Sequence, residues 1–388
     1  MKVLLQFITG IILTVLLFSC REQYTPPQIT ANSNYLVVEG LINTGTDSTI
    51  IKLSRTVKLN AKTTTQTETH AVVTVESDAN ATYPLKEIKP GTYASPALGL
   101  STTAKYRLRI IANTNTHTTY LSDFTVAKDS PPMDSLGYTI QPNGLQIYVN
   151  AHDASNNTRY YRWDYVETWN FYSMYNSGYI AVDTSIISRT LAQQIFSCWG
   201  TNVSPDIVLA SSAKLTQDVI YNSIITTVPS ASEKLSLGYS ILVKQYALTQ
   251  DAFNFWQNLK KNTELLGSIF DAQPSQIQGN IHNINDATEP VFGYVSAGTV
   301  QQKRITMLKT SWPKEWGSDR SAYNNCGYDV VLMKDGYGTF YGNTILNQIP
   351  LYSIVNGSGI IIGYYASTRI CADCTLRGSN KKPSYWPQ

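Results

Sequence analysis

Charged residues are scarce in this sequence of 388 residues. Asp, Glu, Lys and Arg together make up 15% of it, the formal net charge is +3, and no cluster of Lys or Arg concentrates positive charge. Proteins that bind DNA or RNA need such clusters to neutralise phosphates. The composition therefore argues against a nucleic-acid partner.

Motifs for catalysis, phosphate binding and metal binding are also missing. The sequence has no G-x-S-x-G elbow, no P-loop and no G-x-G-x-x-G turn. Its four histidines, His70, His117, His152 and His282, are scattered and form no H-E-x-x-H pair. His282 lies in a Gly-Asn-Ile-His segment, but a lone histidine lacks the second group that chemistry needs. We expect no cofactor, no metal and no enzymatic activity.

Apolar runs of membrane-spanning length are absent as well. The longest run, Val3 to Phe18, follows Lys2 and ends at Leu17-Phe18-Ser19-Cys20, which is typical of a bacterial lipoprotein signal. We predict a signal peptide over residues 1–19, lipidation of Cys20, and a proline-containing tether over residues 20–34. An ordinary cleaved secretory signal is the alternative, because Phe18 is bulky for its position.

Tyrosine, by contrast, is abundant, with 26 residues, and together with Thr, Ser and Asn it favours strands over helices. Residues 35–128 contain seven short strand-like runs separated by turn residues such as Lys89-Pro90-Gly91. The predicted strands are 35–39, 49–53, 71–76, 83–85, 92–94, 106–111 and 118–126. This spacing predicts an immunoglobulin-like β-sandwich that lacks the Cys…Trp…Cys pattern of antibody domains.

A domain boundary is expected at Lys128-Asp129-Ser130-Pro131-Pro132, because consecutive prolines interrupt strand pairing. Residues 129–388 are predicted to form a larger β-rich domain with one or two helices. Its predicted strands include 145–149, 159–169 and 237–248. Thr249 is expected to cap a helix over about 250–261, whose apolar stripe includes Phe253 and Trp256.

Four aromatic residues, Tyr161, Trp163, Tyr165 and Trp169, share one face of the strand predicted at 159–169. Exposed, such a face makes a platform for sugar rings, peptide side chains or a protein partner. Buried, it is one wall of a sandwich core. We carry these residues forward as candidates for contact with a ligand or partner, with core packing as the alternative.

The cysteines other than Cys20 number four, Cys198, Cys326, Cys371 and Cys374. An even number in an oxidising compartment predicts two disulfides, with three possible pairings. The preferred pairing joins Cys198 to a distant cysteine and places the second bridge within the C-terminal set. A redox pair or half of a zinc site is the alternative for Cys371-Ala-Asp-Cys374, but no His lies near and no helical pattern follows.

Glycoside hydrolysis would need two carboxylates at a suitable distance. Asp164, Glu167, Asp329 and Asp335 are available, yet nothing in the sequence singles out an acid and a nucleophile. Polar residues between 279 and 290, namely Asn280, Asn283, Asp286 and Glu289, suit turn capping at least as well as ligand contact.

Three segments carry a resemblance to a known family: Gln245-Tyr-Ala-Leu-Thr-Gln-Asp-Ala-Phe-Asn-Phe-Trp256, then 274–294 with Gly279-Asn-Ile-His-Asn283, and Cys371-Ala-Asp-Cys-Thr-Leu-Arg-Gly378. With Leu36-Val-Val-Glu-Gly40, they make the mature chain resemble the Bacteroidota lipoprotein family called domain of unknown function 4249. The resemblance implies an outer-membrane lipoprotein associated with a TonB-dependent transporter, and it implies no catalytic residue.

These observations together favour a non-enzymatic, lipid-anchored outer-membrane protein. We expect an accessory or substrate-capturing partner of a TonB-dependent transporter, displayed on the cell surface in preference to the periplasmic face. An exported hydrolase acting on glycans or peptides and a structural or adhesive surface protein are the alternatives.

Overall fold

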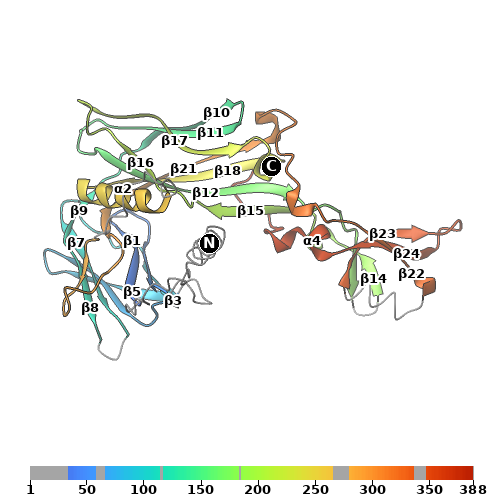
Figure 1. Cartoon of the computed structure of the whole chain (residues 1–388), viewed down its shortest axis with the longest axis horizontal. Coiled ribbons are helices and arrows are strands. Elements are labelled where there is room, and N and C mark those ends of the chain that lie inside the picture. The colour runs from blue at the N-terminus through green and yellow to red at the C-terminus, as the bar shows by residue number, and fades with distance from the viewer. Residues whose placement is uncertain are drawn as a thin grey trace, which may run out of the picture.

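The computed structural model describes residues 34–57, 66–113, 117–182, 185–264, 279–335 and 347–387. The predicted signal peptide, Cys20 and the tether up to residue 33 lie outside the described residues. Three bodies follow one another along the molecule: an N-terminal sandwich, a central sandwich and a distal lobe (Figure 1). Strands make up most of their regular structure, so the prediction of a mainly β fold is confirmed.

The N-terminal sandwich forms from short strands whose apolar residues alternate. In β2 (Thr49–Arg55), for example, Ile51 and Leu53 are buried while Ile50 and Lys52 are exposed, as the period of two requires. The other strands from this part of the chain are β1 (Leu36–Asn43), β3 (Gln66–Thr67), β4 (Val72–Ser77), β5 (Thr82–Lys89), β6 (Thr92–Ser95), β7 (Lys105–Ile111), β8 (Thr119–Ser122) and β9 (Thr125–Lys128). They agree with the predicted strands, with two differences: β3 was not predicted, and the run 118–126 forms two strands, β8 and β9.

Residues 279–298 return to the N-terminal sandwich, which corrects the domain division predicted at residue 128. Strand β19 (Ile281–Asn283) pairs with β8, and β20 (Ser296–Gly298) lies between β1 and β9 in parallel register. Ile281 and Val295 are buried in the core of this sandwich. Both strands are only three residues long, too short for alternation to show in the sequence.

The central sandwich packs two antiparallel sheets against each other (Figure 1). One sheet contains β10 (Met133–Gln141), β11 (Gly144–Asp153) and β17 (Asp218–Pro229). The other contains β15 (Ser197–Val203), β16 (Val208–Ser211), β12 (Tyr160–Tyr172), β18 (Gly238–Ala247) and β21 (Val300–Leu308). The three strands predicted here, 145–149, 159–169 and 237–248, correspond to β11, β12 and β18.

The aromatic face of β12 belongs to this core, so the platform interpretation is wrong. Tyr161 and Trp163 are fully buried, Tyr165 is 2% exposed, and Trp169 packs against the same cluster. Two of the polar atoms are bonded inside the core: the Tyr161 hydroxyl donates to Asp218, and Trp163 Nε1 donates to Gln245 Oε1 at 3.0 Å. The opposing sheet covers the face that an isolated strand would expose.

One long helix, α2 (Gln250–Glu264), follows β18 directly. The Thr249 hydroxyl accepts a hydrogen bond from the Ala252 amide at 3.2 Å, which confirms the predicted cap. The helix extends three residues beyond the predicted end at 261. Among the described residues, none of the helices combines the length and the apolar character needed to cross a membrane.

The distal lobe is a separate body, so residues 129–388 do not form the single domain predicted. It contains the hairpin β13 (Tyr179–Val182) and β14 (Ser185–Ser188), a sheet of β22 (Asp329–Leu332), β24 (Ile361–Ser367) and β23 (Ile349–Val355), and the short helix α4 (Arg369–Ala372). Tyr179 packs edge-on against Tyr364, which joins the hairpin to the sheet.

Turns of 3₁₀ helix occupy Leu191–Gln193, Glu233–Leu235, Lys309–Ser311, Ser321–Tyr323, Met333–Asp335 and Cys374–Leu376.

Two disulfides lie where the distal lobe meets the central sandwich. Cys198, on β15, pairs with Cys374, and Cys326 pairs with Cys371. The preferred pairing is therefore confirmed. Cys371 and Cys374 belong to different bridges, so the redox-pair interpretation of Cys371-Ala-Asp-Cys374 is wrong, and both thiols are unavailable as zinc ligands.

Candidate ligand-binding cleft

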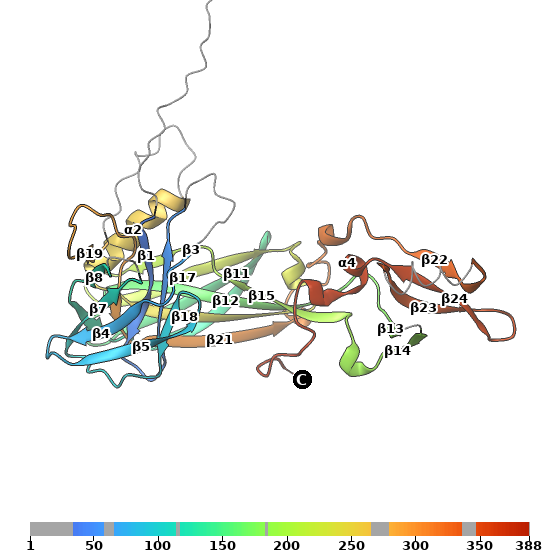
Figure 2. The ribbon, with the colours of Figure 1, turned by 90° about the horizontal axis from the view of Figure 1, so that it is seen from below.

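A cleft of about 970 Å³ lies where the N-terminal sandwich meets the central sandwich. This volume is at the upper end of the range of about 300–1,000 Å³ that is typical of small-molecule sites. Strands β1 and β2 line one side, and β12, β18, α2 and the loop 204–207 line the other. Figures 1 and 2 both show α2 beside β1 at this junction. A molecule in the cleft therefore contacts two domains at once.

The side formed by the N-terminal sandwich carries one carboxylate and one ammonium group side by side. Glu39 of β1 and Lys52 of β2 are direct partners in the antiparallel register, so their side chains leave the sheet on the same face. Ile50 of β2 also lines the cleft and is 45% exposed. The alternation that buries Ile51 and Leu53 is what directs Ile50 and Lys52 outward.

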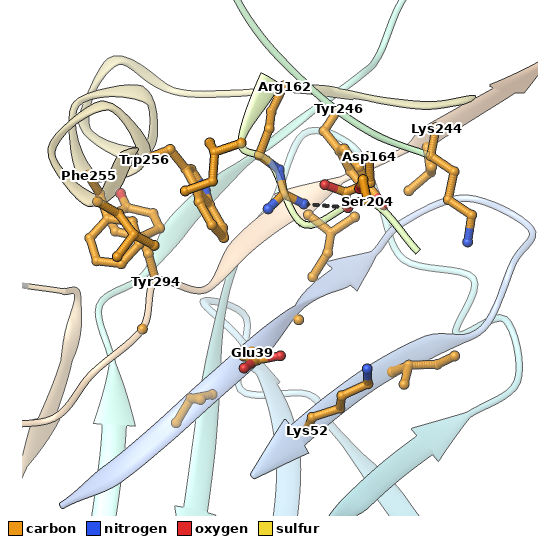
Figure 3. A pocket seen from close by; sticks show the side chains of 18 of the residues that line it. Glu39, Lys52, Arg162, Asp164, Ser204, Lys244, Tyr246, Phe255, Trp256 and Tyr294 are labelled. Carbon is orange, nitrogen blue, oxygen red and sulfur yellow. Dashed lines mark hydrogen bonds and ion pairs between the residues drawn. The ribbon is translucent and has the colours of Figure 1, made fainter. Parts of the chain in front are cut away.

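The side formed by the central sandwich repeats this pattern on β12 and β18. Asp164 is the direct partner of Lys244, and Arg162 that of Tyr246. These side chains leave the face of β12 opposite the buried aromatic residues. Figure 3 shows Arg162, Asp164 and Lys244 on strands above the cleft and Glu39 and Lys52 on strands below it.

Arg162 is held in place by stacking. Its guanidinium carbon lies 4.1 Å from the centre of the Trp256 ring and 4.6 Å from that of Tyr246, and its Nη2 donates to Asp164 Oδ2 at 3.1 Å. Such cation–π contacts fix a cation without neutralising it. The pKa of the Tyr246 phenol is raised, first because burial disfavours the phenolate and second because the Asp164 carboxylate lies nearby.

Helix α2 positions the rest of this side. Lys260 Nζ donates to the carbonyl oxygen of Ile207 at 2.6 Å, and Glu264 Oε1 accepts from the amide of the same residue at 2.6 Å. These two bonds hold the loop 204–207 at the rim of the cleft. Phe255 contacts both Trp256 and Tyr294 through its ring, at centroid distances of 5.5 and 5.4 Å. The aromatic rings of the cleft are therefore packed on one another.

Several charges in the cleft have no counter-ion. Among the described residues, no ion pair and no side-chain hydrogen bond involves Glu39, Lys52 or Lys244, although Glu39 and Lys52 are register partners. Asp206, on the rim loop, accepts only a long hydrogen bond of 3.4 Å from the Tyr165 hydroxyl. The lining as a whole carries three cations, Lys52, Arg162 and Lys244, and four carboxylates, Glu39, Asp47, Asp164 and Asp206.

The carboxylates considered for hydrolysis do not converge. Asp164 faces the cleft, whereas Glu167 is buried in the core, where it accepts hydrogen bonds from Lys234 at 2.5 Å and from the Tyr239 hydroxyl at 2.7 Å. Asp329 and Asp335 lie in the distal lobe, in β22 and in the 3₁₀ turn that follows it. The geometry offers no acid and nucleophile pair among these four.

The polar segment near residue 280 is structural. Asn280 exchanges two hydrogen bonds of 2.9 Å with the backbone of Val295. Asn283 and Asp286 accept bonds from nearby backbone amides, and Glu289 accepts from the Tyr120 hydroxyl at 2.9 Å. The turn-capping interpretation therefore describes Asn283 and Asp286, whereas Asn280 and Glu289 bond to distant segments.

The histidines lie apart from the cleft lining. His282 Nε2 lies 3.4 Å from Asp123 Oδ1 at an exposed site. Within the described ranges, no group of three or more His, Cys, Asp or Glu side chains is arranged to hold a metal ion.

Sequence reasoning missed the cleft because its two sides come from segments far apart in the chain. One signal was available. The period of two that aligned Tyr161, Trp163 and Tyr165 also places Arg162 and Asp164 together on the other face. That second face carries the functional groups.

Comparison with known proteins gives a family. Among curated proteins, none matches the chain. A two-domain fibronectin type-III segment from chicken tenascin matches over 55% of this chain and 91% of its own, with 12% sequence identity and a TM-score of 0.16, which is too low for a functional argument. The family model described as "Domain of unknown function (DUF4249)" matches residues 21–304, well over half of the sequence. The chain therefore belongs to the DUF4249 family.

Proposed function

We propose that this protein is a non-enzymatic binding protein that captures its ligand in the cleft between the two sandwiches. The observation that carries the proposal is the set of charged side chains, Glu39 and Lys52 on one side and Lys244 on the other, that face the cleft and form no ion pair within the part of the chain that the structure describes. Unpaired charges in a concave site are available for a ligand, and each gains most when a partner replaces water.

The cleft also suits capture better than catalysis. Its polar groups come from rigid strands, and Arg162 is fixed between two rings, which lowers the entropic cost of binding. The proposal extends to the cell: lipid attached to Cys20 anchors the protein to the outer membrane, and it passes its ligand to a TonB-dependent transporter. The sequence of residues 17–20 and the family resemblance support this part.

A variant that fills the cleft tests the binding function. Replacing the exposed Ile50 with Trp adds a bulky ring on a strand that tolerates it. Small molecules that co-purify with the full chain from its native host, identified by mass spectrometry, should be lost in Ile50→Trp. They should be retained in the matched variant Val72→Trp, whose site on β4 is also exposed and lies outside the cleft. Identical small-molecule profiles in the two variants would contradict capture in the cleft.

Two experiments test the cellular part. Metabolic labelling with a fatty-acid analogue should label the wild-type protein and leave Cys20→Ala unlabelled. Affinity purification of the tagged protein from detergent-solubilised membranes should recover a TonB-dependent transporter. Recovery of no transporter, from cells in which the protein is lipidated, would count against the partnership without affecting the cleft.

A further inference from the structure

We propose that the ligand of the cleft is a zwitterionic peptide of a few residues with free termini. This inference rests on the proposed function and names the ligand class of the same site. It follows from which groups of the lining are already satisfied and which are not.

The aromatic groups of the cleft are largely occupied by one another. One face of Trp256 is covered by the Arg162 guanidinium at 4.1 Å, and the same guanidinium covers the Tyr246 ring. Phe255 is engaged by Trp256 and Tyr294. A neutral sugar binds mainly by stacking on open aromatic faces, and it would leave the ions of the lining without a partner. The arrangement therefore favours a charged ligand.

The signs of the unpaired groups define that charge. The lining carries three cations and four carboxylates, so it has nearly balanced charge and attracts neither a polyanion nor a polycation. On the central-sandwich side, Asp164 is engaged by Arg162, which leaves Lys244 and the remaining Arg162 N–H groups as donors. On the opposite side, Glu39 and its register partner Lys52 form no ion pair among the described residues, so Glu39 is available as an acceptor and Lys52 as a further donor. A molecule that carries one carboxylate and one ammonium group, well separated, satisfies both sides.

A peptide has these properties. Its carboxylate meets Lys244 and Arg162, its terminal amine meets Glu39, and its side chains lie along the apolar part of the lining near Phe255 and Leu259. A volume of about 970 Å³ exceeds the needs of a single amino acid and is within the range that accommodates molecules of drug size. The distance between the two charged sides then selects peptides by length.

The test combines changes in the ligand with changes in the protein. The probe is a pool of peptides of about three to six residues from a casein digest, a size that suits the cleft volume. The pool is used with free termini, with acetylated amines, or with amidated carboxyls. The full chain is incubated with each pool, and retained peptides are measured by mass spectrometry after gel filtration. A pool of neutral oligosaccharides of similar mass is run in parallel.

The expected result is a double-mutant cycle between the terminus and the residue that receives it. Lys244→Gln should weaken retention of free peptides by roughly tenfold or more, the effect of one charge-assisted hydrogen bond, and should have little effect on amidated peptides. Glu39→Gln should do the same for free peptides and should have little effect on acetylated ones. Both residues lack partners, so neither substitution should disturb folding. Lys105→Gln, an exposed lysine on β7 outside the cleft, should match the wild type.

The outcomes separate the two proposals. Equal retention of the free, acetylated and amidated pools, or retention of the oligosaccharides instead, would overturn the peptide assignment. Capture in the cleft would still stand if Ile50→Trp abolishes that retention. The wild-type protein could also retain none of the pools and still co-purify with a small molecule that is lost in Ile50→Trp. That result would overturn the peptide assignment but not capture in the cleft. If the wild-type protein retains no pool and Ile50→Trp leaves the co-purified molecules unchanged, both the peptide assignment and the proposed function fail.

Discussion

The guanidinium carbon of Arg162 lies 4.1 Å from the centre of the Trp256 ring, and this contact joins the central strand β12 to helix α2 at the cleft. Arg162 therefore holds β12 against α2 and also lines the cleft. The two residues are 94 positions apart in the sequence, and the local sequence pattern at neither position predicts their contact.

Removing the charge at position 162 should destabilise the protein modestly. Arg162→Met keeps an aliphatic stem against the rings but removes the cation–π contacts and the bond to Asp164, so we expect a loss of about 1–2 kcal/mol in the free energy of unfolding. Urea denaturation measures it. Lys105→Met, at an exposed site outside the cleft, should change stability by less than about 0.5 kcal/mol. Equal values for the two variants would show that the stacking is energetically silent.

The buried Glu167 depends on Lys234. Its side chain is 3% exposed, and Lys234 is its cationic partner. Lys234→Met leaves a buried carboxylate bonded to the Tyr239 hydroxyl and to Asn202 without a counter-ion, and we expect a loss of about 2–4 kcal/mol at neutral pH. The double variant Lys234→Met with Glu167→Gln should recover part of that loss, because no charge remains unpaired. A double variant less stable than Lys234→Met would contradict this account.

The disulfides should map as two long-range bridges. A digest of unreduced protein should yield linked peptides for Cys198–Cys374 and Cys326–Cys371. A bond between Cys371 and Cys374 would contradict the structure. Replacing Cys198 and Cys374 together by Ala should cost about 2–4 kcal/mol. Hydrogen exchange should place the loss in the central sandwich and distal lobe, because the described N-terminal sandwich contains no cysteine.

His152 should contribute stability that is lost as the pH rises through its raised folded-state pKa. The hydrogen bond with Asp134, and next the charge of that carboxylate, raise the pKa of His152 above its ordinary value. A raised pKa in the folded state means that the stabilisation is complete below the unfolded-state pKa of about 6.5 and disappears as the pH rises through the folded-state pKa. A nuclear magnetic resonance titration should give a higher pKa for His152 in the wild type than in Asp134→Asn. Identical titration curves would refute the pairing.

Much of the local structure could be predicted from the sequence because it depends on local patterns. Alternation identified the strands of the N-terminal sandwich, and Thr249 marked the start of the helix correctly. The preferred disulfide arrangement also agreed with the structure. The strands and the start of the helix depend on residue type and on short-range geometry, whereas the disulfide prediction rested on the number and spacing of the cysteines.

The cleft and the domain division could not be predicted because both depend on contacts between distant segments. Alternation showed that Tyr161, Trp163 and Tyr165 share a face, but only the second sheet decides that this face is buried. Likewise, the three-residue segments β19 and β20 form strands only because they pair with β8, β1 and β9. Tertiary pairing, which no single segment encodes, settles these features.

The position of β20 late in the sequence affects how the N-terminal sandwich folds. Strand β20 sits between β1 and β9, yet it is synthesised after most of the central sandwich. Until residues 296–298 are synthesised, the N-terminal sandwich therefore has a gap in its sheet, with unsatisfied backbone groups along β1 and β9. Closing that gap requires contacts between segments far apart in the chain, which slows folding. A chain truncated before residue 296 lacks this strand, and its N-terminal sandwich should keep an open gap between β1 and β9.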